Sequence, residues 1–234
     1  MFYLILIQGI LEAFPVSSSL HLAFFNLKSG NDALMHFGSA FALFFIINKF
    51  IINRFKNLFS GFFSEVIKFF LFIFPTIILG FLFSKRSFSL YHSLIFNIIA
   101  AVFMVAVDLY QQRNKSLSSL SFFNSFLIGS LVSLALVPGF SRLGISFTAF
   151  RLFSLRRIDS LVLSLAIGIP ISLGASLIGF IQGDNITYSL IFSSIASGFL
   201  NYAFLFITFK LINSWWIYGL YRVCISFFFL FFCC

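Results

Sequence analysis

The sequence predicts an all-α, polytopic integral membrane protein, and two features carry that prediction. Of the 234 residues, 61% are hydrophobic and only 9% are charged, and the mean hydropathy is +1.09. An ordinary soluble domain carries about 25% charged residues, so this composition excludes a soluble globular surface. The apolar residues also fall into helix-length stretches separated by short basic segments, which is the pattern of helices that cross a bilayer. We expect one membrane domain over residues 1–234.

The net charge of +9 raises the alternative of a nucleic-acid-binding protein. The basic residues lie mostly between apolar stretches, where they fix the orientation of a membrane protein, so we expect no nucleic-acid partner. The three cysteines, Cys224, Cys233 and Cys234, lie in or after the last apolar stretch without metal-ligand spacing, and we assign them no chemistry. The first ten residues lack a charged segment followed by a cleavage site, so we expect them to remain in the mature protein.

The first apolar segment, residues 2–14, is too short to cross a membrane. At about 1.5 Å per residue it covers roughly 20 Å of a hydrocarbon core about 30 Å thick before Pro15 interrupts it. Proline ends a helix, and non-helical backbone at membrane depth is tolerated only inside protein or beside a wet cavity. We therefore expect a re-entrant helix pair with Pro15 at its tip.

The residues around this break are unusually polar for a membrane segment. Ionisable side chains at membrane depth are costly, and by default they mark a functional site. The polar side chains of this stretch are Gln8, Glu12, Ser17, Ser18, Ser19 and His21.

The other apolar stretches divide the chain into two halves around its longest polar connection, residues 111–119. This division predicts two repeats, at about residues 1–110 and 120–234. The predicted spans are residues 33–47, 66–83, 92–110, 160–180, 187–209 and 215–232, and residues 120–137 are expected to form an apolar leg that Pro138 ends.

The prolines support these repeats, because all four fall into two matching pairs. Pro15 and Pro138 each end an apolar leg with a serine three residues later, whereas Pro75 and Pro170 each lie within a predicted span. Corresponding interruptions in two halves are typical of inverted-topology repeats with a binding site at their interface. Each repeat is expected to begin with a proline-broken re-entrant helix pair.

The charge distribution favours the same topology, because cytoplasmic loops carry an excess of Lys and Arg. If the first re-entrant pair enters and leaves on the outer side, the second dips from the inner side, and the two tips meet near the middle. The basic residues are then nine inside (Lys49, Arg54, Lys56, Arg113, Lys115, Arg151, Arg156, Arg157 and Lys210) and three outside (Lys28, Lys85 and Arg86).

Two such tips would form one polar pocket suited to a phosphorylated ligand. A planar guanidinium binds phosphate oxygens bidentately, helix N-termini add N–H donors, and hydroxyls can donate or attack. A carboxylate in the same pocket repels phosphate unless a divalent cation lies between them, so a metal ion is expected. An imidazole can exchange protons with the attacking or leaving group. The second tip contributes Ser141, Arg142 and Ser146 to this set.

Structural roles are the alternative for several of these residues. A serine in a membrane helix often bonds its own backbone, and an isolated Arg142 could extend its charged end to the interface. We expect His36 and His92 to be structural or interfacial. The acidic residues Asp32, Asp108, Asp159 and Asp184 are expected in loops, caps or span ends.

At these motifs the chain resembles the undecaprenyl-diphosphatase family, the bacitracin-resistance membrane phosphatases. The first family motif, Glu-Gly-x-x-Glu-x-x-Pro-x-Ser-Ser-x-Gly-His, corresponds to residues 8–21, and the second, Pro-Gly-x-Ser-Arg-Ser-Gly, to residues 138–144. Smaller similarities extend to residues 38–39, 164–170 and 221–222, so the resemblance covers essentially the whole chain.

The resemblance implies a multi-pass hydrolase of the bacterial inner membrane that opens to the outer, periplasmic side. Its activity would convert undecaprenyl diphosphate, a C55 isoprenyl diphosphate lipid, into undecaprenyl phosphate and phosphate, recycling the lipid carrier of cell-wall synthesis. A Mg²⁺ or Ca²⁺ ion is expected, and a homodimer is left open. The implied residues are catalytic Glu12, Ser18, His21 and Arg142, substrate-binding Ser17, Ser19, Ser141, Arg142 and Ser146, and metal-binding Glu12 and Gln8.

The chain departs from the family pattern at several positions. Gln8 replaces the first glutamate, Leu20 the glycine before the histidine, and Leu143 the serine after the arginine. Two further positions that are acidic or amide in the family are Val132 and Val162 here. The amide oxygen of Gln8 can still coordinate a cation, although it brings no charge.

These departures leave two other functions open. A transporter or flippase could carry the phosphorylated lipid through the same inverted-repeat pocket with reduced or no hydrolysis. A non-catalytic membrane scaffold is the third alternative, but it would not need Arg142 beside Ser141 at a helix break.

Overall fold

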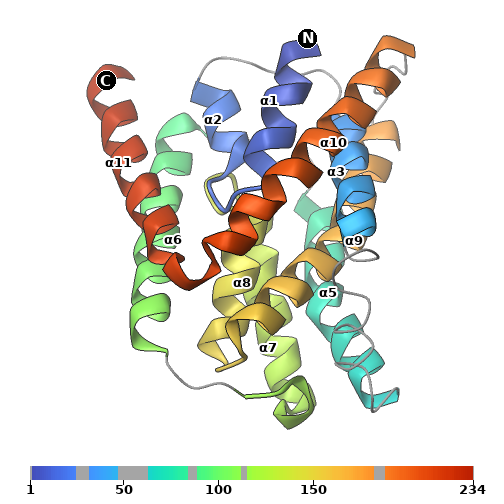
Figure 1. Ribbon diagram of the computed structural model, residues 1–234, viewed down its shortest axis with the longest axis vertical. Coiled ribbons are helices and arrows are strands. Elements are labelled where there is room, and N and C mark those ends of the chain that lie inside the picture. The colour runs from blue at the N-terminus through green and yellow to red at the C-terminus, as the bar shows by residue number, and fades with distance from the viewer. Residues whose placement is uncertain are drawn as a thin grey trace.

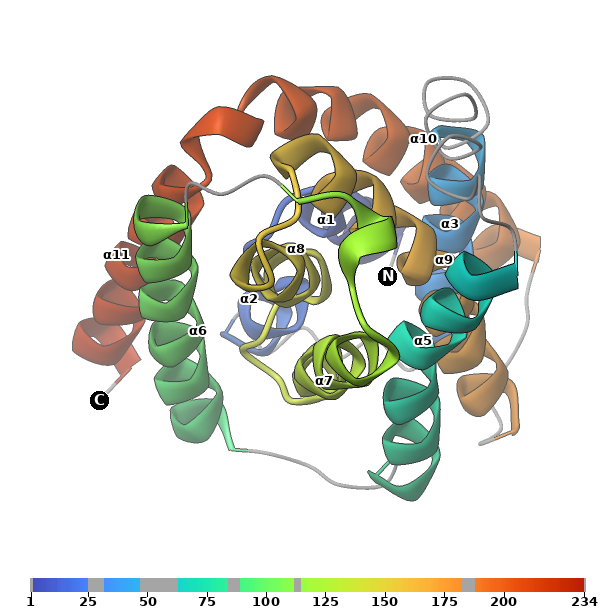
Figure 2. The same ribbon diagram turned by 90° about the horizontal axis from the view of Figure 1, so that it is seen from below.

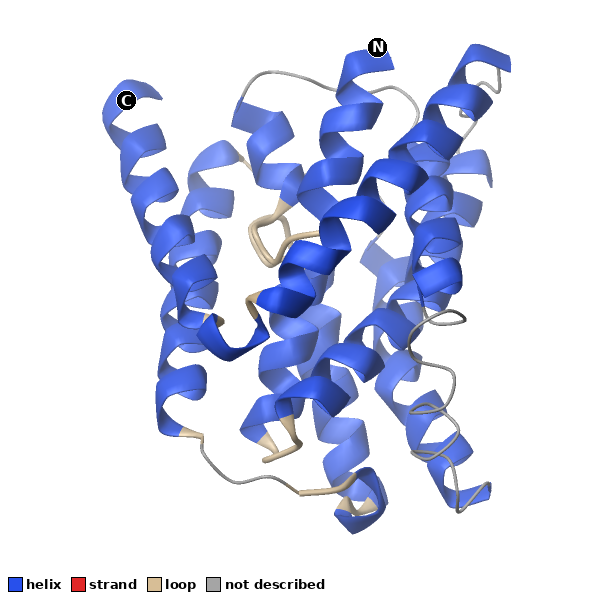
Figure 3. Cartoon of the chain, viewed as in Figure 1, coloured by secondary structure: helices blue, strands red, loops and turns tan. Residues whose placement is uncertain are grey.

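A computed structural model describes residues 2–24, 32–46, 63–83, 89–111, 115–181 and 188–233, and within them the chain is helical (Figures 1 and 3). The α-helices are α1 (Phe2–Glu12), α2 (Ser18–Phe24), α3 (Asp32–Ile46), α5 (Phe63–Phe83), α6 (Leu90–Tyr110), α7 (Phe122–Val132), α8 (Arg142–Leu152), α9 (Arg157–Ile181), α10 (Tyr188–Lys210) and α11 (Trp216–Cys233). In the same described ranges there are three 3₁₀ turns, η2 (Leu117–Ser119), η3 (Ser133–Leu136) and η4 (Ile212–Ser214).

The prediction of an all-α, multi-pass membrane protein is confirmed. Within the described ranges, four helices, in α5, α6, α9 and α10, are long and apolar enough to cross a membrane, and shorter apolar helices accompany them. Large apolar side chains such as Tyr3, Phe63 and Phe81 are exposed, while Asn97, Asn201 and Arg222 are fully buried. Apolar groups outside and polar groups inside are expected of a protein that has lipid as its solvent.

Two broken hairpins occupy the middle of the bundle. The hairpin α1–α2 approaches from one end and α7–α8 from the other, and their breaks come close together near mid-height (Figure 1). Viewed along the bundle, α3, α5, α6, α9, α10 and α11 surround these four short helices (Figure 2). The predicted repeat symmetry and the division at residues 111–119 stay predictions.

The breaks fall at the predicted prolines. After Pro15 the chain reverses through Ser17, whose φ of 64° lies in the left-handed region that residues other than glycine seldom adopt. After Pro138 it reverses through Gly139, with φ 102°. A Cβ at Gly139 would lie 2.3 Å from the carbonyl oxygen of Ser93, so glycine is needed for both the conformation and the close approach to α6.

The apolar leg predicted over residues 120–137 contains two kinds of helix. The α-helix ends at Val132, and η3 continues it as a tighter turn. Val137 is extended, with φ −87° and ψ 124°, because the ring of Pro138 disfavours helical backbone in the preceding residue. Pro75 and Pro170, by contrast, lie inside α5 and α9, as expected of prolines within spans.

Small residues bring α1 and α3 against α10. A Cβ added to Gly9 would lie 2.3 Å from Ser197 Oγ, and one added to Gly38 would lie 2.2 Å from the carbonyl oxygen of Ser194. Small side chains allow helices to approach this closely in membrane proteins. The contact fixes α3 beside α1, which matters because both helices contribute to the site described next.

Several predicted features lie outside the described residues. They are the basic positions Lys28, Lys49, Arg54, Lys56, Lys85, Arg86 and Arg113, together with Asp184.

Candidate functional site

The two breaks line one cavity of about 280 Å³. Polar groups from α1, α2, α3, α8 and α9 enter it, and apolar side chains such as Leu11, Phe14 and Ile171 form the rest of its wall. The polar lining residues are Glu12, Ser17, Ser18, Ser19, His36, Ser141, Arg142 and Ser172.

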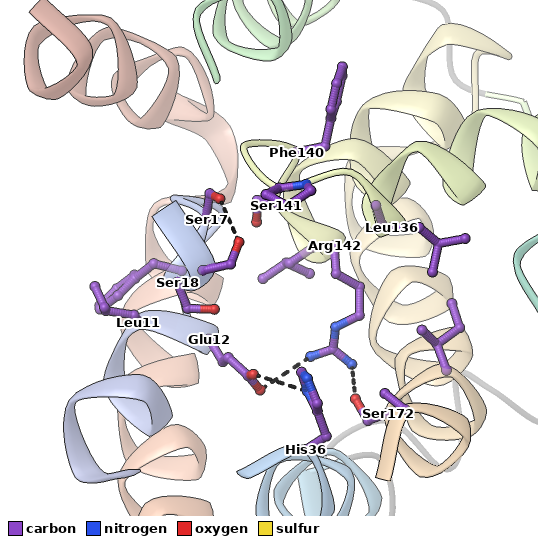
Figure 4. Close-up of a pocket in the computed structure, with 17 residues that line it drawn as sticks. Leu11, Glu12, Ser17, Ser18, His36, Leu136, Phe140, Ser141, Arg142 and Ser172 are labelled. Atoms are coloured by element: carbon purple, nitrogen blue, oxygen red, sulfur yellow. Dashed lines mark hydrogen bonds and ion pairs between the residues drawn. The ribbon is translucent and has the colours of Figure 1, made fainter. Parts of the chain in front are cut away.

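Glu12, the last residue of α1, is the carboxylate of this cavity (Figure 4). Its Oε1 accepts a hydrogen bond from Gln8 Nε2 at 3.0 Å and lies 3.4 Å from His36 Nδ1. Its Oε2 lies 3.9 Å from Arg142 Nη2 and has no hydrogen-bond partner among the described residues. The side chain is only 7% exposed, so its negative charge depends on these neighbours.

Arg142, the first residue of α8, meets Glu12 from the second motif. Its Nη1 donates to the carbonyl oxygen of Gly168 at 2.8 Å and to Ser172 Oγ at 2.7 Å, both on α9. A Cβ at Gly168 would lie 2.7 Å from Nη1, so a larger residue at 168 would force the guanidinium to shift from its present position against this carbonyl. Nη1 is held by α9, whereas Nη2 lies at the longer ion-pair distance of 3.9 Å from Glu12 Oε2, so a ligand can bind at the edge formed by Nε and Nη2.

Ser17 and Ser141 lie on the opposite side of the cavity from the Glu12–His36 pair (Figure 4). Ser17 Oγ lies 3.4 Å from Ser19 Oγ. Ser18 is half-buried at the start of α2. Ser141 is the N-cap of α8, and its Oγ accepts a hydrogen bond from the backbone N–H of Gly144 at 3.3 Å. Ser17, Ser18, Ser19 and Ser141 are thus brought together with Glu12 and Arg142 as the sequence predicts.

Three predicted site residues do not line the cavity. His21 has its Nδ1 2.9 Å from the carbonyl oxygen of Ser17 and its Nε2 2.9 Å from the Tyr221 hydroxyl. Ser146 Oγ donates to the carbonyl oxygen of Arg142 at 2.7 Å, which is the local backbone bond common for serine in helices. Gln8 turns its amide nitrogen toward Glu12. The catalytic, substrate-binding and metal roles of these three residues stay predictions.

Sequence reasoning missed two members of the cavity. His36, expected to be structural or interfacial, instead lines the cavity beside Glu12. Ser172, which received no role, holds Arg142. The signal for His36 was present, since it is an ionisable residue inside an apolar span and follows the same rule that singled out Glu12.

The donor set fits a divalent cation that shares its shell with a ligand. Within the described ranges, Glu12 Oε2 is a buried carboxylate oxygen that accepts no hydrogen bond, and serine hydroxyls line the same cavity. In the described part of the chain, no group of three or more His, Cys, Asp or Glu side chains is placed to coordinate a metal ion. Magnesium is often held by one or two carboxylates and completed by phosphate oxygens and water, which is the arrangement these residues allow.

This architecture defines a multi-pass membrane protein whose two helix breaks hold an arginine and a carboxylate at a shared polar cavity. Comparison with known families then gives the particular one: the chain belongs to the bacitracin resistance protein BacA family, whose model matches residues 1–228.

Curated relatives agree with this assignment. The chain is 30% identical over 210 residues to the undecaprenyl-diphosphatase of Thermosipho africanus, covering 84% of this chain and 85% of the relative. It is 31% identical over 240 residues to the undecaprenyl-diphosphatase of Pelagibacter ubique, covering 94% and 92%. The undecaprenyl-diphosphatase of Thermosipho melanesiensis is 31% identical over 216 residues, covering 86% and 85%.

Proposed function

We propose that this protein hydrolyses undecaprenyl diphosphate to undecaprenyl phosphate and inorganic phosphate, recycling the lipid carrier of cell-wall synthesis. The family and the names of the relatives support this substrate. The observation that carries the proposal is the approach of Arg142 and Glu12, from opposite halves of the chain, to 3.9 Å in one serine-lined cavity. The comparisons give no support to the transporter alternative, since the relatives bear the name of a hydrolase.

Arg142 binds the terminal phosphate in this proposal. Its Nη1 is occupied by Gly168 and Ser172, so the phosphate oxygens meet the Nε–Nη2 edge. A planar guanidinium held in this way presents two parallel N–H donors to phosphate and spreads its positive charge over the transferring group.

The attacking oxygen comes from Ser18 or from a water molecule. It forms a new P–O bond to the terminal phosphorus while the bond to the bridging oxygen breaks, and undecaprenyl phosphate leaves with the bonding electron pair. His36 takes the proton of the attacking oxygen, because it lines the cavity and Glu12 Oε1, 3.4 Å away, stabilises the imidazolium. If Ser18 attacks, water then releases phosphate from the serine in a second step of the same kind.

His21 has a different part in this proposal from the acid–base role implied by the family motif. Its contacts with the Ser17 carbonyl and the Tyr221 hydroxyl support the loop that carries the serines. It holds Ser17 in its left-handed conformation and so orients Ser18.

A Mg²⁺ or Ca²⁺ ion is part of the proposal. Glu12 would hold it through Oε2, with the remaining ligands from diphosphate oxygens and water. When bound, such an ion neutralises charge on the diphosphate. Gln8 would have to turn its amide over to offer an oxygen, so in this proposal it orients Glu12 through Oε1.

The proposed location is the bacterial inner membrane, with the cavity open to the outer side. The family is one of bacitracin resistance, and the clustering of Arg151, Arg156 and Arg157 at the α8–α9 end supports a cytoplasmic position for that end. A homodimer stays a prediction.

The test is phosphate release from undecaprenyl diphosphate by the purified protein, with Mg²⁺, with Ca²⁺ and with chelator. The proposal expects release that is abolished in Glu12→Ala and restored by neither metal in that variant. Absence of release from the folded wild-type protein under all three conditions would overturn it.

A further inference from the structure

Arg222, in the middle of α11, contacts both helix breaks. Its side chain is fully buried. Nη1 donates to the carbonyl oxygen of Pro15 at 3.5 Å, and Nη2 donates to the carbonyl oxygen of Gly139. One guanidinium therefore joins the tip of the α1–α2 hairpin to the tip of the α7–α8 hairpin, which lie near mid-height beside α11 (Figure 1).

The third side of the guanidinium is anchored to α6. Nε donates to Asn97 Oδ1 at 2.8 Å, while Asn97 Nδ2 donates to the Arg222 carbonyl oxygen at 3.1 Å and to Ser226 Oγ at 2.8 Å. Asn97 and Ser226 are themselves fully buried. These contacts hold the plane of the guanidinium in place independently of its hydrogen bonds to the two breaks. The guanidinium can therefore act as a rigid link between them.

The breaks need such partners because interrupting a helix leaves carbonyl oxygens without the backbone N–H groups that usually donate to them. In a membrane interior each unsatisfied carbonyl is costly. In the first break, Thr208 Oγ1 donates to the carbonyl oxygen of Ala13 at 2.6 Å, and His21 contacts that of Ser17. Arg222 supplies the donor for the carbonyl oxygen of Pro15 between them.

The positions that Arg222 contacts stand immediately before the cavity serines. Pro15 precedes Ser17 by two residues, and Gly139 precedes Ser141 by two. Both serines line the cavity, and Arg142 follows Ser141. A change in the separation of the two carbonyls would therefore be passed to the serines on one side and to Arg142 on the other.

The charge of Arg222 is not neutralised locally. Among the described residues it makes no ion pair with a carboxylate, and its partners are carbonyl and amide oxygens and the sulfur of Met104. A buried cation of this kind is tolerated through several hydrogen bonds to oxygen dipoles. An anionic diphosphate in the neighbouring cavity would gain from its field.

We propose that Arg222 is a positioning residue of the phosphatase reaction, which sets the spacing between the two breaks and so the distance from the serine hydroxyls to Arg142. The proposal rests on the proposed function for its effect on turnover, but the link itself does not. Arg222 lies outside the cavity lining, so it is not a catalytic residue.

The main test compares Arg222→Lys with Ser226→Ala. The lysine keeps the buried charge, but a single ammonium cannot hold Asn97 and two separate carbonyls in one plane. Since a displacement of about 1 Å can cost about 100-fold in rate, we expect kcat to fall by about that factor while KM changes much less. Ser226→Ala removes a hydrogen bond of the same Asn97, within the same α6–α11 contact, without touching a break, and is expected to retain kcat within about twofold.

Hydrogen–deuterium exchange without substrate provides the independent measurement. The backbone N–H of Val16 donates to Phe14 O, and that of Phe140 donates to Val137 O, so peptides covering residues 13–19 and 137–142 report on the two breaks. Arg222→Lys should raise deuterium uptake in both peptides, and Ser226→Ala in neither. Because no turnover is involved, this result still tests the link if the wild-type protein releases no phosphate.

Asn97→Ala is the second variant, should Arg222→Lys fail to fold. It leaves the guanidinium present but removes its anchor on α6. We expect higher deuterium uptake in both break peptides and a lower kcat, with a smaller loss of kcat than in Arg222→Lys. Unchanged exchange in either break, or full kcat in a folded Arg222→Lys protein, would overturn the proposal; so would an Asn97→Ala protein that matches the wild type in both measurements.

Discussion

Arg142 is held in the cavity by the two hydrogen bonds that its Nη1 donates to α9. Arg142→Lys should lower kcat/KM by about 100-fold or more, because lysine cannot keep Gly168 and Ser172 and also present a planar edge to phosphate. Phosphate release over a range of lipid concentrations measures the loss. Ser172→Ala is the graded comparison, since it removes one anchor and leaves the guanidinium, and it should lose about tenfold at most. Near-normal turnover in Arg142→Lys would make Arg142 a structural cation.

The two histidines near the first break are assigned opposite roles, and each assignment can be tested. His36→Gln should reduce kcat by about 100-fold or more, because a positioned general base contributes about that much. If His36 accepts the proton, wild-type activity falls as the pH is lowered and the imidazole becomes protonated, and this acidic limb should be missing from the profile of His36→Gln.

His21→Gln is the matched comparison on the other side of the loop. A glutamine can still contact the Ser17 carbonyl or the Tyr221 hydroxyl, so we expect a milder loss and a retained acidic limb. The opposite pattern, in which the limb disappears with His21 and persists without His36, would return the acid–base role to His21.

Gln8 stands one helical turn before Glu12, and the proposed cation predicts that its side chain affects metal affinity. Gln8→Glu places a second carboxylate where an amide now donates at 3.0 Å, and two carboxylates at that distance repel unless a cation lies between them. The variant should therefore reach half-maximal phosphate release at a lower Mg²⁺ concentration than the wild type. Gln8→Met removes the hydrogen bond without adding charge, and it should not lower the metal requirement. An unchanged requirement in Gln8→Glu would contradict a cation at Glu12.

At the scale of helices, alanine substitutions at two glycines of α9 can be compared, one beside Arg142 and one away from it. Gly168→Ala introduces a Cβ 2.7 Å from Arg142 Nη1 and 3.0 Å from Leu43 Cδ1, so the guanidinium must leave the Gly168 carbonyl. We expect the affinity for the lipid diphosphate, measured through KM, to weaken by about tenfold, the equivalent of about one charge-assisted hydrogen bond. Gly174→Ala on the same helix meets nothing within 4 Å in the part of the chain that the structure describes, and it should leave KM unchanged. Equal effects of the two changes would mean that α9 as a whole is sensitive.

The helices show which parts of the fold and site were accessible from sequence. Pro15 and Pro138 interrupt the apolar pattern directly, so both breaks and the meeting of Glu12 with Arg142 could be predicted. The 3₁₀ turn before Pro138 could not, because apolar periodicity does not distinguish it from α-helix. The sequence marked His36 as an ionisable residue inside an apolar span, but it could not place His36 beside Glu12. That distance depends on how closely α1 and α3 approach α10, and the roles of Gly9 and Gly38 in this approach are evident only once their neighbours are known.

At the scale of the whole molecule, one cluster of charged side chains lies at the end of the bundle where α8 meets α9. Arg151, Arg156 and Arg157 line a second cavity together with Asp108 and Trp216. Arg157 forms an ion pair with Asp108, and Asp108 Oδ2 accepts a hydrogen bond from the backbone N–H of Trp216, which begins α11. The end of the molecule that carries these arginines is therefore also the end at which α11 starts.

The far end of α11 lies with the first hairpin. Phe229 stacks on Phe24 of α2 with ring centroids 3.5 Å apart, so α11 runs from the arginine-rich end to the end where α2 finishes. If Lys and Arg mark the cytoplasmic side, the last turn of α11 emerges on the outer side. A C-terminal alkaline phosphatase fusion should then be active, and a C-terminal green fluorescent protein fusion should be dark, in cells that make equal amounts of both. The reverse result would invert the molecule, put the first hairpin on the cytoplasmic side, and require the diphosphate to reach the cavity from within the cell.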